Sequence, residues 1–322
     1  MPTTIALSRE NSPSRNKIAH WCDRSNDVSQ ITFPTANNKN FCVMKANISK
    51  IRNGLADVYP KQEIDAMVRI IFEQLMGYST VDMVLRADSE VPGFISAKID
   101  DVVERLRRKE PIQYILDDAY FYGMHFHVTP ATLIPRPETE QLIDLIVDNN
   151  PASNLSVLDV GTGSGCIAIA LARSLRFASV SAIDISPDAI AVAERNAREL
   201  KAKVRFAVAD ILTAVPHKEQ YDIIVSNPPY IADSERKAME SNVLDYEPHT
   251  ALFVPDDDPL CFYRAITQYA LSALKPGGRL YFEINPRFAD DTVRLLTDSG
   301  LQQVELHRDY TDRLRFATAR KP

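Results

Sequence analysis

The residues best suited to hold a planar amide or amino group form the tetrapeptide NPPY, which follows the apolar run 221–225. Pro228 and Pro229 remove two backbone donors and fix two φ angles, so their turn is stiff and its carbonyls stay outside any helix. Asn227 adds an amide with a donor and an acceptor, and Tyr230 adds an aromatic face. The other interpretation is a proline-rich strand exit with its tyrosine in the core.

A glycine-rich segment, VLDVGTGSG at 157–165, precedes NPPY by about seventy residues. It runs from an apolar strand through Asp159 to glycines at alternate positions, Gly161, Gly163 and Gly165, which permit a tight turn and a close ligand. A dinucleotide site would show GxGxxG, with a pyrophosphate at the helix N-terminus. Here Asp159 lies inside the motif, where it suits an ammonium group better than a pyrophosphate. The pattern therefore favours S-adenosylmethionine.

Strand and helix patterns alternate after residue 156, which predicts an α/β fold with a mostly parallel sheet and helices on both faces. The expected strands lie near residues 156–160, 179–184, 203–208, 221–226 and 279–284. Ligands of such sheets bind at the carboxyl ends of the strands. Asp159, Asp184, Asp210 and Asn227 all fall at those ends, so we expect one shared pocket.

Composition describes an ordinary globular protein of 322 residues with 45% hydrophobic residues and a net charge of −6. The acidic balance argues against a protein that relies on non-specific attraction to nucleic acid, so no direct nucleic-acid substrate is expected. No apolar stretch has the length of a membrane helix and none resembles a signal peptide, so we expect no membrane association and a cytoplasmic protein. The four cysteines show no metal-ligand spacing. His125 and His127 face the same way on the expected strand and could bind a metal, but no third ligand lies nearby, so no metal is expected.

The chain is expected to contain four parts, with boundaries at residues 1–43, 44–118, 119–135 and 136–322. The first is polar and aperiodic, which predicts a disordered extension, and Met44 is then the expected biological start. The second has apolar residues at helical spacing and predicts a small domain for protein recognition. The third alternates around Gly123 as a hairpin does. The helical positions are Ile64, Met67, Val68, Ile71, Leu75, Val81, Val84, Leu85, Ile95, Ile99, Val102, Val103 and Leu106.

Several segments together resemble the protein-(glutamine-N5) methyltransferases of peptide-chain release factors, the HemK family. They are DVGTGSG, AIDIS, VAD and NPPY, with EPIQYI, FYGMHFHV, LIPRPETE and YEPHTAL, and the resemblance runs from about Met44 to the C-terminus. It implies a Rossmann-like class I methyltransferase sheet of seven strands with an antiparallel end, formed by 303–307 and 314–319, plus a small N-terminal helical domain. It also implies methyl transfer from S-adenosylmethionine, giving S-adenosylhomocysteine, to the glutamine of the GGQ motif in class I release factors.

For the catalytic step, the oxygen of Asn227 and the carbonyl of Pro228 are assigned as acceptors for the two hydrogens of the substrate amide. The Asn227 NH2 is then available to the substrate carbonyl, Pro229 completes the turn, and Tyr230 packs on the amide plane. Glu247, in the EP segment that follows NPPY, is expected to close over the substrate together with Pro248.

For the cofactor, Asp184 is expected to accept from both ribose hydroxyls, and Asp210 to contact adenine beside Ile211. Either carboxylate could instead cap a helix, although Ser186 is the better cap after Asp184. The resemblance also places Arg136 with Glu138 at the methionine end. The glycine loop and Asn227 complete the cofactor set, with Asp159 at the ammonium group and the cofactor backbone against Gly161, Thr162, Gly163 and Gly165.

Three alternatives stay open from the sequence: a ribosomal-protein glutamine methyltransferase, an adenine-N6 nucleic-acid methyltransferase, and a non-catalytic binding module. An adenine enzyme would be expected to carry a basic face or a target-recognition domain. The chain departs from the family pattern at Asp117 and Asn285, where glycine is usual. Neither position holds a proposed catalytic atom.

Overall fold

The computed structural model describes residues 42–216 and 218–322, which form two compact units that divide between Arg108 and Lys109. The extension expected over residues 1–43 lies outside the described residues except at its end. There Cys42–Val43 (β1) pairs antiparallel with Glu90–Val91 (β2) and ends directly before Met44. Among the residues that the structure describes, none of the helices combines the length and the apolar character of a membrane-spanning segment.

The first unit is helical. Its helices are α1 (Met44–Leu55), α2 (Lys61–Met76), α3 (Thr80–Leu85) and α4 (Gly93–Arg107). The expected apolar positions of α2 and α4 pack inward, as Ile71 and Ile99 show by their complete burial. Helix α3 differs, because it has only six residues and buries none of them. Its expected helical positions Val81, Val84 and Leu85 are exposed.

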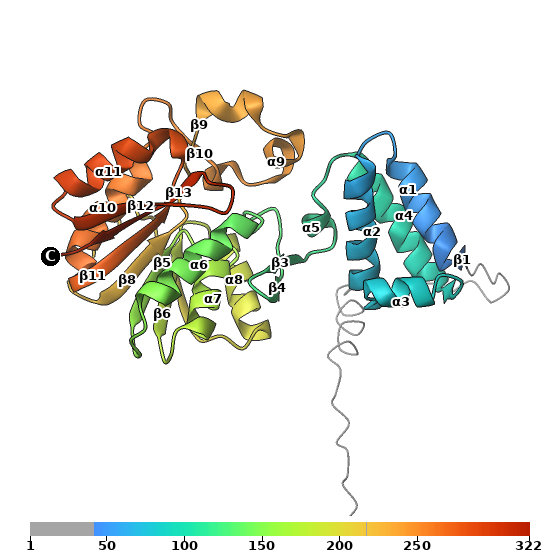
Figure 1. Ribbon diagram of the computed structural model, residues 1–322, viewed down its shortest axis with the longest axis horizontal. Helices are drawn as coiled ribbons and strands as arrows, with labels where there is room; N and C mark the ends of the chain where they lie inside the picture. Colours follow the sequence, from blue (N-terminus) through green and yellow to red (C-terminus); the bar gives the residue numbers. More distant parts are fainter. Residues whose placement is uncertain (1–41, 217) are drawn as a thin grey trace, which may run out of the picture. The chain divides into compact units, whose positions relative to one another are not determined.

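The second unit is built on a sheet that has seven strands in the described part of the chain (Figure 1). The order is β12-β13-β11-β8-β5-β6-β7, with β13 antiparallel to its neighbours and the strands from β11 to β7 parallel. This confirms the expected α/β class with an antiparallel end. The strands are β5 (Ser156–Val160), β6 (Ser179–Asp184), β7 (Val204–Val208), β8 (Tyr221–Ser226), β11 (Leu274–Glu283), β12 (Gln302–Arg308) and β13 (Leu314–Arg320).

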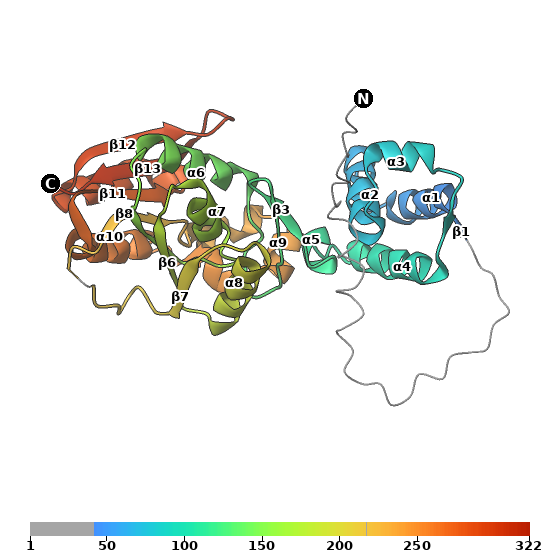
Figure 2. The same ribbon diagram turned by 90° about the horizontal axis from the view of Figure 1, so that it is seen from below.

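Helices cover both faces of this sheet because successive strand residues point to opposite sides. Val157 of β5 packs with α6 (Pro137–Asn149), α7 (Cys166–Ser174) and α8 (Pro187–Glu199). Leu158, the next residue, packs with the helices of the other face. Figure 2 shows α6 and α10 on opposite sides of the strands. The helices of this second face are α10 (Cys261–Ala273) and α11 (Ala289–Asp298).

Shorter elements join these layers and surround the carboxyl edge of the sheet. Before the sheet, α5 leads into the hairpin of β3 and β4, which pair antiparallel. Between β8 and α10, a connection of short elements includes the parallel pair β9 and β10. The elements are α5 (Ile112–Ile115), β3 (Ala119–Phe121), β4 (Met124–Phe126), β9 (Ile231–Ala232), η3 (Asp233–Ala238), α9 (Ser241–Tyr246), η4 (His249–Ala251), β10 (Phe253–Val254) and η5 (Pro286–Phe288).

β11 contains the segment KPGG, residues 275–278, ahead of the strand expected near 279–284. Leu274 pairs with Tyr221 and Arg279 pairs with Ile223, so four residues of β11 face one residue of β8. Such an irregularity lets the chain bulge and then resume pairing. The strand therefore begins at Leu274, earlier than the start near residue 279 that the pattern predicts.

We predict that Gly165→Ala destabilises the protein by about 2 kcal/mol or more. Gly165 has φ +81°, and a β-carbon there would meet the β-carbon of Ala193 at 3.0 Å. Gly123, with φ +73° and no described atom within 4 Å of that position, is the matched control. Gly123→Ala should cost only the left-handed strain, about 1 kcal/mol. Urea unfolding of both variants measures the difference, and equal losses would contradict tight packing at Gly165.

Candidate active site

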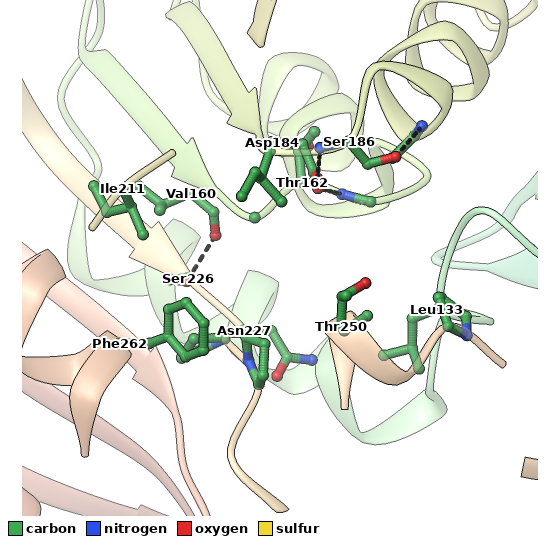
Figure 3. Close-up of a pocket in the computed structure, with 18 of the residues that line it drawn as sticks. Leu133, Val160, Thr162, Asp184, Ser186, Ile211, Ser226, Asn227, Thr250 and Phe262 are labelled. Carbon is green, nitrogen blue, oxygen red and sulfur yellow. Dashed lines mark hydrogen bonds between the residues drawn. The ribbon is translucent and has the colours of Figure 1, made fainter. Parts of the chain in front are cut away.

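A cavity of about 560 Å³ lies in the second unit at the carboxyl ends of β5, β6 and β8. Figure 3 shows Asp184 and Thr162 on one side of it and Asn227 with Thr250 on the opposite side. The size is that of a site for a small molecule or cofactor. Its walls come from residues 131–139, 160–167, 183–189, 209–212, 226–229 and 248–266, with gaps within these ranges.

The glycine loop bends from β5 into α7 along one wall of the cavity. Gly161 and Thr162 donate their backbone N–H groups to the Ile183 carbonyl at 2.9 and 3.0 Å, which ties the loop to β6. At Gly161 and Gly163 φ is +74° and +54°, and no described atom lies within 4 Å of where a β-carbon would stand. This leaves the backbone open to a ligand. Gly165 is outside the cavity lining, and its closest neighbour is α8.

Asp159 is completely buried and does not line the cavity. Its Oδ2 accepts from the Thr162 hydroxyl at 2.6 Å, while its Oδ1 has no hydrogen-bond partner among the described residues. Burial raises the pKa of Asp159 to about 7, against the lowering effect of the Thr162 hydrogen bond. The predicted contact with an ammonium group stays a prediction, and the observed role of Asp159 is to support the loop from below.

Asp184 ends β6 and lines the cavity. Its two carboxylate oxygens accept from the backbone N–H groups of Gly163 and Ser186, each at 2.9 Å. Because each oxygen has further lone pairs, the carboxylate can still accept from a ligand. Ser186 caps α8 by accepting from the Ala189 N–H, so the helix cap is provided by the residue that the sequence favoured.

Asp210 and Ile211 follow β7 and both line the cavity. The Asp210 carboxylate accepts from the Leu212 N–H at 2.9 Å, a bond within a turn, because the described residues between β7 and β8 contain no helix that it could cap. One oxygen of this carboxylate has no hydrogen bond to a described residue. Apolar side chains complete this part of the wall: Val160, Ile183, Ile185, Ile211, Leu212 and Phe262.

The NPPY loop leaves β8 on the opposite wall. Buried Ser226 anchors its start, because its hydroxyl donates to the Val160 carbonyl at 2.6 Å. Asn227, Pro228 and Pro229 line the cavity, and the Asn227 amide has no hydrogen bond to any of the described residues. Figure 3 shows this amide directed into the cavity.

Tyr230 is placed differently from the other three residues of the loop. It is half-buried and outside the cavity lining, and its hydroxyl donates to Oε1 of Glu283 at 3.0 Å. Burial raises its pKa, and the negative charge of Glu283 adds to this. Packing of its ring on a substrate amide stays a prediction, whereas its hydroxyl belongs to a network behind the loop.

Arg136 lines the cavity and forms an ion pair with Glu247, whose side chain is almost completely buried. The Nη2–Oε1 distance is 2.6 Å, and the second oxygen of Glu247 accepts from the Ile134 N–H at 3.2 Å. Glu247 therefore ties the connection after NPPY to the segment before α6. Pro248 lines the cavity, while Glu138 is outside the lining. Closure of Glu247 and Pro248 over a substrate stays a prediction.

The sequence interpretation missed Glu283 and Thr139. Glu283 is 1% exposed at the end of β11 and accepts from the hydroxyls of Thr139 and Tyr230. Burial raises the pKa of Glu283, while the two hydroxyl donors lower it. The available signal was a glutamate directly after the apolar run 280–282 at the carboxyl end of a strand, a signal similar to the one that identified Asp159 and Asp184.

Two family models match this chain. One, for a methyltransferase domain, matches residues 151–298, and the other, for the PrmC N-terminal domain, matches residues 48–116. The fold, the cavity at the carboxyl ends of the strands and this match define a methyltransferase.

Curated relatives narrow the class. A release factor glutamine methyltransferase of Bacteroides thetaiotaomicron is 44% identical over 272 residues, which cover 84% of this chain and 98% of the relative. One of Flavobacterium psychrophilum is 43% identical, with 79% and 91% covered, and one of Streptococcus pneumoniae is 43% identical, with 66% and 76% covered. The chain belongs to the release factor glutamine methyltransferase family.

We predict that Asp159→Asn stabilises the ligand-free protein increasingly as the pH rises. The folded-state pKa of about 7 lies above the ordinary value of 3.8, so the folded chain binds the extra proton between these values. Stability from this group is present below pH 4 and is lost as the pH rises toward 7. The variant minus wild-type difference in free energy of unfolding should therefore grow between pH 5 and pH 8. A constant difference over this range would contradict a raised pKa.

Proposed function

We propose that this protein transfers a methyl group from S-adenosylmethionine to the side-chain amide nitrogen of the glutamine in the GGQ motif of class I peptide-chain release factors. The observation that carries this proposal is the unpaired Asn227 amide on a proline-stiffened loop, directed into the cavity. The names of the curated relatives support the choice of substrate. A cytoplasmic location belongs to the same proposal, because release factors act in translation.

The cavity residues fit S-adenosylmethionine. The open backbone at Gly161 and Gly163 leaves room for the methionine part, and the free Oδ1 of Asp159 below it supports a positive end. Asp184 has acceptor capacity left for ribose hydroxyls, and the apolar wall beside Asp210 and Ile211 suits a flat base with an exocyclic amino group. When bound, the cofactor supplies an electrophilic methyl group on a sulfonium.

Methyl transfer of this kind is an in-line displacement, so the protein acts mainly by aligning the nucleophile in a dry site. The difficulty lies with the amide nitrogen, whose lone pair is delocalised into its carbonyl. Acceptors directed at both of its hydrogens favour the geometry in which the nitrogen becomes tetrahedral and, once methylated, releases one of these hydrogens to solvent as a proton. The Asn227 oxygen and the Pro228 carbonyl are the acceptors, with Pro229 keeping the turn rigid and the Asn227 NH2 donating to the substrate carbonyl.

The helical unit, residues 44–118 in the sequence interpretation, is proposed to recognise the release factor. Support comes from the exposed apolar residues Val81, Val84 and Leu85, which lie on one side of α3 at spacings of three and four. Exposed apolar groups that gather on one helix face are typical of protein contact sites.

Asn227→Ala should abolish most transfer while leaving the cofactor bound. We expect kcat to fall about 100-fold or more, as when one preorganised polar group is removed from other active sites. The dissociation constant for S-adenosylmethionine, measured by calorimetry, should change less than about threefold, since Asn227 faces the substrate. Asn149→Ala, at an exposed residue of α6, is the control. Unchanged turnover in Asn227→Ala would contradict the assignment of the NPPY loop as the site that binds the substrate amide.

Asp184→Ala should instead weaken cofactor binding. Loss of hydrogen bonds to a charged acceptor is expected to cost about 1.5 to 3 kcal/mol, roughly a 10- to 100-fold rise in dissociation constant. The matched control is Asp188→Ala, because Asp188 is an exposed carboxylate outside the cavity lining. Equal affinities of the Asp184 variant and the wild type would refute the ribose role.

The substrate is tested by offering three candidates side by side with labelled S-adenosylmethionine: a class I release factor, ribosomal proteins and DNA. Mass mapping then locates the labelled residue. We expect label on the GGQ glutamine and none on a release factor in which this glutamine is replaced by alanine. Label on a ribosomal protein or on adenine would keep the cavity chemistry but overturn the proposed substrate.

A further inference from the structure

Glu283 connects three segments that meet behind the NPPY loop. Its carboxylate accepts from Tyr230 after β8 at 3.0 Å and from Thr139 in the first turn of α6 at 2.7 Å. Glu283 itself ends β11, where Phe282 is paired with Ser226, so it lies level with the start of the loop. Thr139 lines the cavity but Glu283 does not, which excludes direct contact of this carboxylate with a ligand there.

A second bond from the same strand end holds the backbone of Tyr230. The Asn285 NH2 donates to the Tyr230 carbonyl and to Oε2 of Glu235, both at 3.0 Å, and its oxygen accepts from the Arg287 N–H. Tyr230 is thus fixed at its hydroxyl by Glu283 and at its carbonyl by Asn285. The start of the loop is fixed independently by Ser226 on Val160.

Between these two anchors the chain has little freedom. Only Asn227, Pro228 and Pro229 intervene, and the two prolines have fixed φ angles. A shift of Tyr230 must therefore be transmitted to the Pro228 carbonyl and the Asn227 amide. In a reaction that depends on alignment, a displacement of about 1 Å can reduce the rate about 100-fold.

The buried carboxylate of Glu283 also favours a role in bonding other side chains of the protein, as distinct from contact with a ligand. A buried carboxylate is unfavourable unless hydrogen bonds and opposite charge compensate it. Two hydroxyls donate to Glu283, and the charge of Arg315 acts on it from β13, where Arg315 is paired with Asp309 at 3.0 Å. Apolar residues in place of Glu283 and its partners would fill the same space, but they would offer no hydrogen bond to the Tyr230 hydroxyl.

We propose that Glu283 is a positioning residue for methyl transfer, which acts through the Tyr230 hydroxyl to hold Asn227 and Pro228 in the geometry that the amide substrate requires. This inference rests on the proposed function of the same site. It gives Tyr230 a role behind the loop, distinct from contact with the substrate.

Tyr230→Phe tests the proposal, because it keeps the ring and removes only the hydroxyl bond. Its matched control is Tyr281→Phe, on the same strand as Glu283, where a completely buried tyrosine loses one hydrogen bond from Asn150. We expect kcat to fall about 10-fold or more in Tyr230→Phe, with the affinity for S-adenosylmethionine unchanged, and to stay within about twofold of wild type in Tyr281→Phe. Rates are expressed per cofactor-binding site, so a loss of folded protein does not lower them.

Glu283→Gln provides the second measurement, since an amide cannot accept from both hydroxyls in the same way. If Glu283 acts through Tyr230, the double variant should lose no more activity than the more impaired single variant. A Tyr230→Phe rate equal to that of Tyr281→Phe would overturn the positioning role, as would multiplicative losses in the double variant. A wild-type protein that binds the cofactor but methylates no glutamine would instead overturn the proposed function itself.

Discussion

The parallel pairing of β5 with β6 on one side and β8 on the other is the constraint on which the site depends. It brings the three carboxyl ends to one edge, so that the glycine loop, Asp184 and Asn227 surround the same cavity. The chain reaches β6 and β8 by connections that leave in opposite directions along the sheet, and a crevice opens where they separate. The hydrogen bond from the Ser226 hydroxyl to the Val160 carbonyl links β8 to β5 just below this crevice.

The polar groups at this edge of the sheet are of two kinds, which differ in their hydrogen-bond partners. Asp184 and Asp210 accept from backbone N–H groups and shape their own loops, which leaves part of each carboxylate for a ligand. Asn227 has no such bond, and its loop is held by prolines and by the buried network of Glu283 and Asn285. The wall of Asp184 and Asp210 is thus fixed by backbone hydrogen bonds, and the wall of Asn227 by side chains behind its loop.

Much of this arrangement was predictable because it depends on local signals at strand ends. The apolar runs located β5, β6 and β8, and the polar residue after each run identified a group at the cavity or beneath it. Contacts between distant segments were not predictable. Glu283 follows Tyr230 by more than fifty residues, and only the pairing of β8 with β11 brings them together. For the same reason the pattern could not separate Gly163, open to the cavity, from Gly165, which packs on Ala193.

Helical spacing also failed to distinguish covered from exposed faces in the first unit. The same periodicity that buries Ile71 leaves Val84 exposed, because burial depends on what packs against the helix. The most direct test of the account is a crystal structure with S-adenosylhomocysteine and a peptide containing the GGQ glutamine. We predict that the glutamine nitrogen lies within hydrogen-bond distance of the Asn227 oxygen and the Pro228 carbonyl, facing the cofactor sulfur. A glutamine amide bound elsewhere, with Asn227 in contact only with solvent, would contradict it.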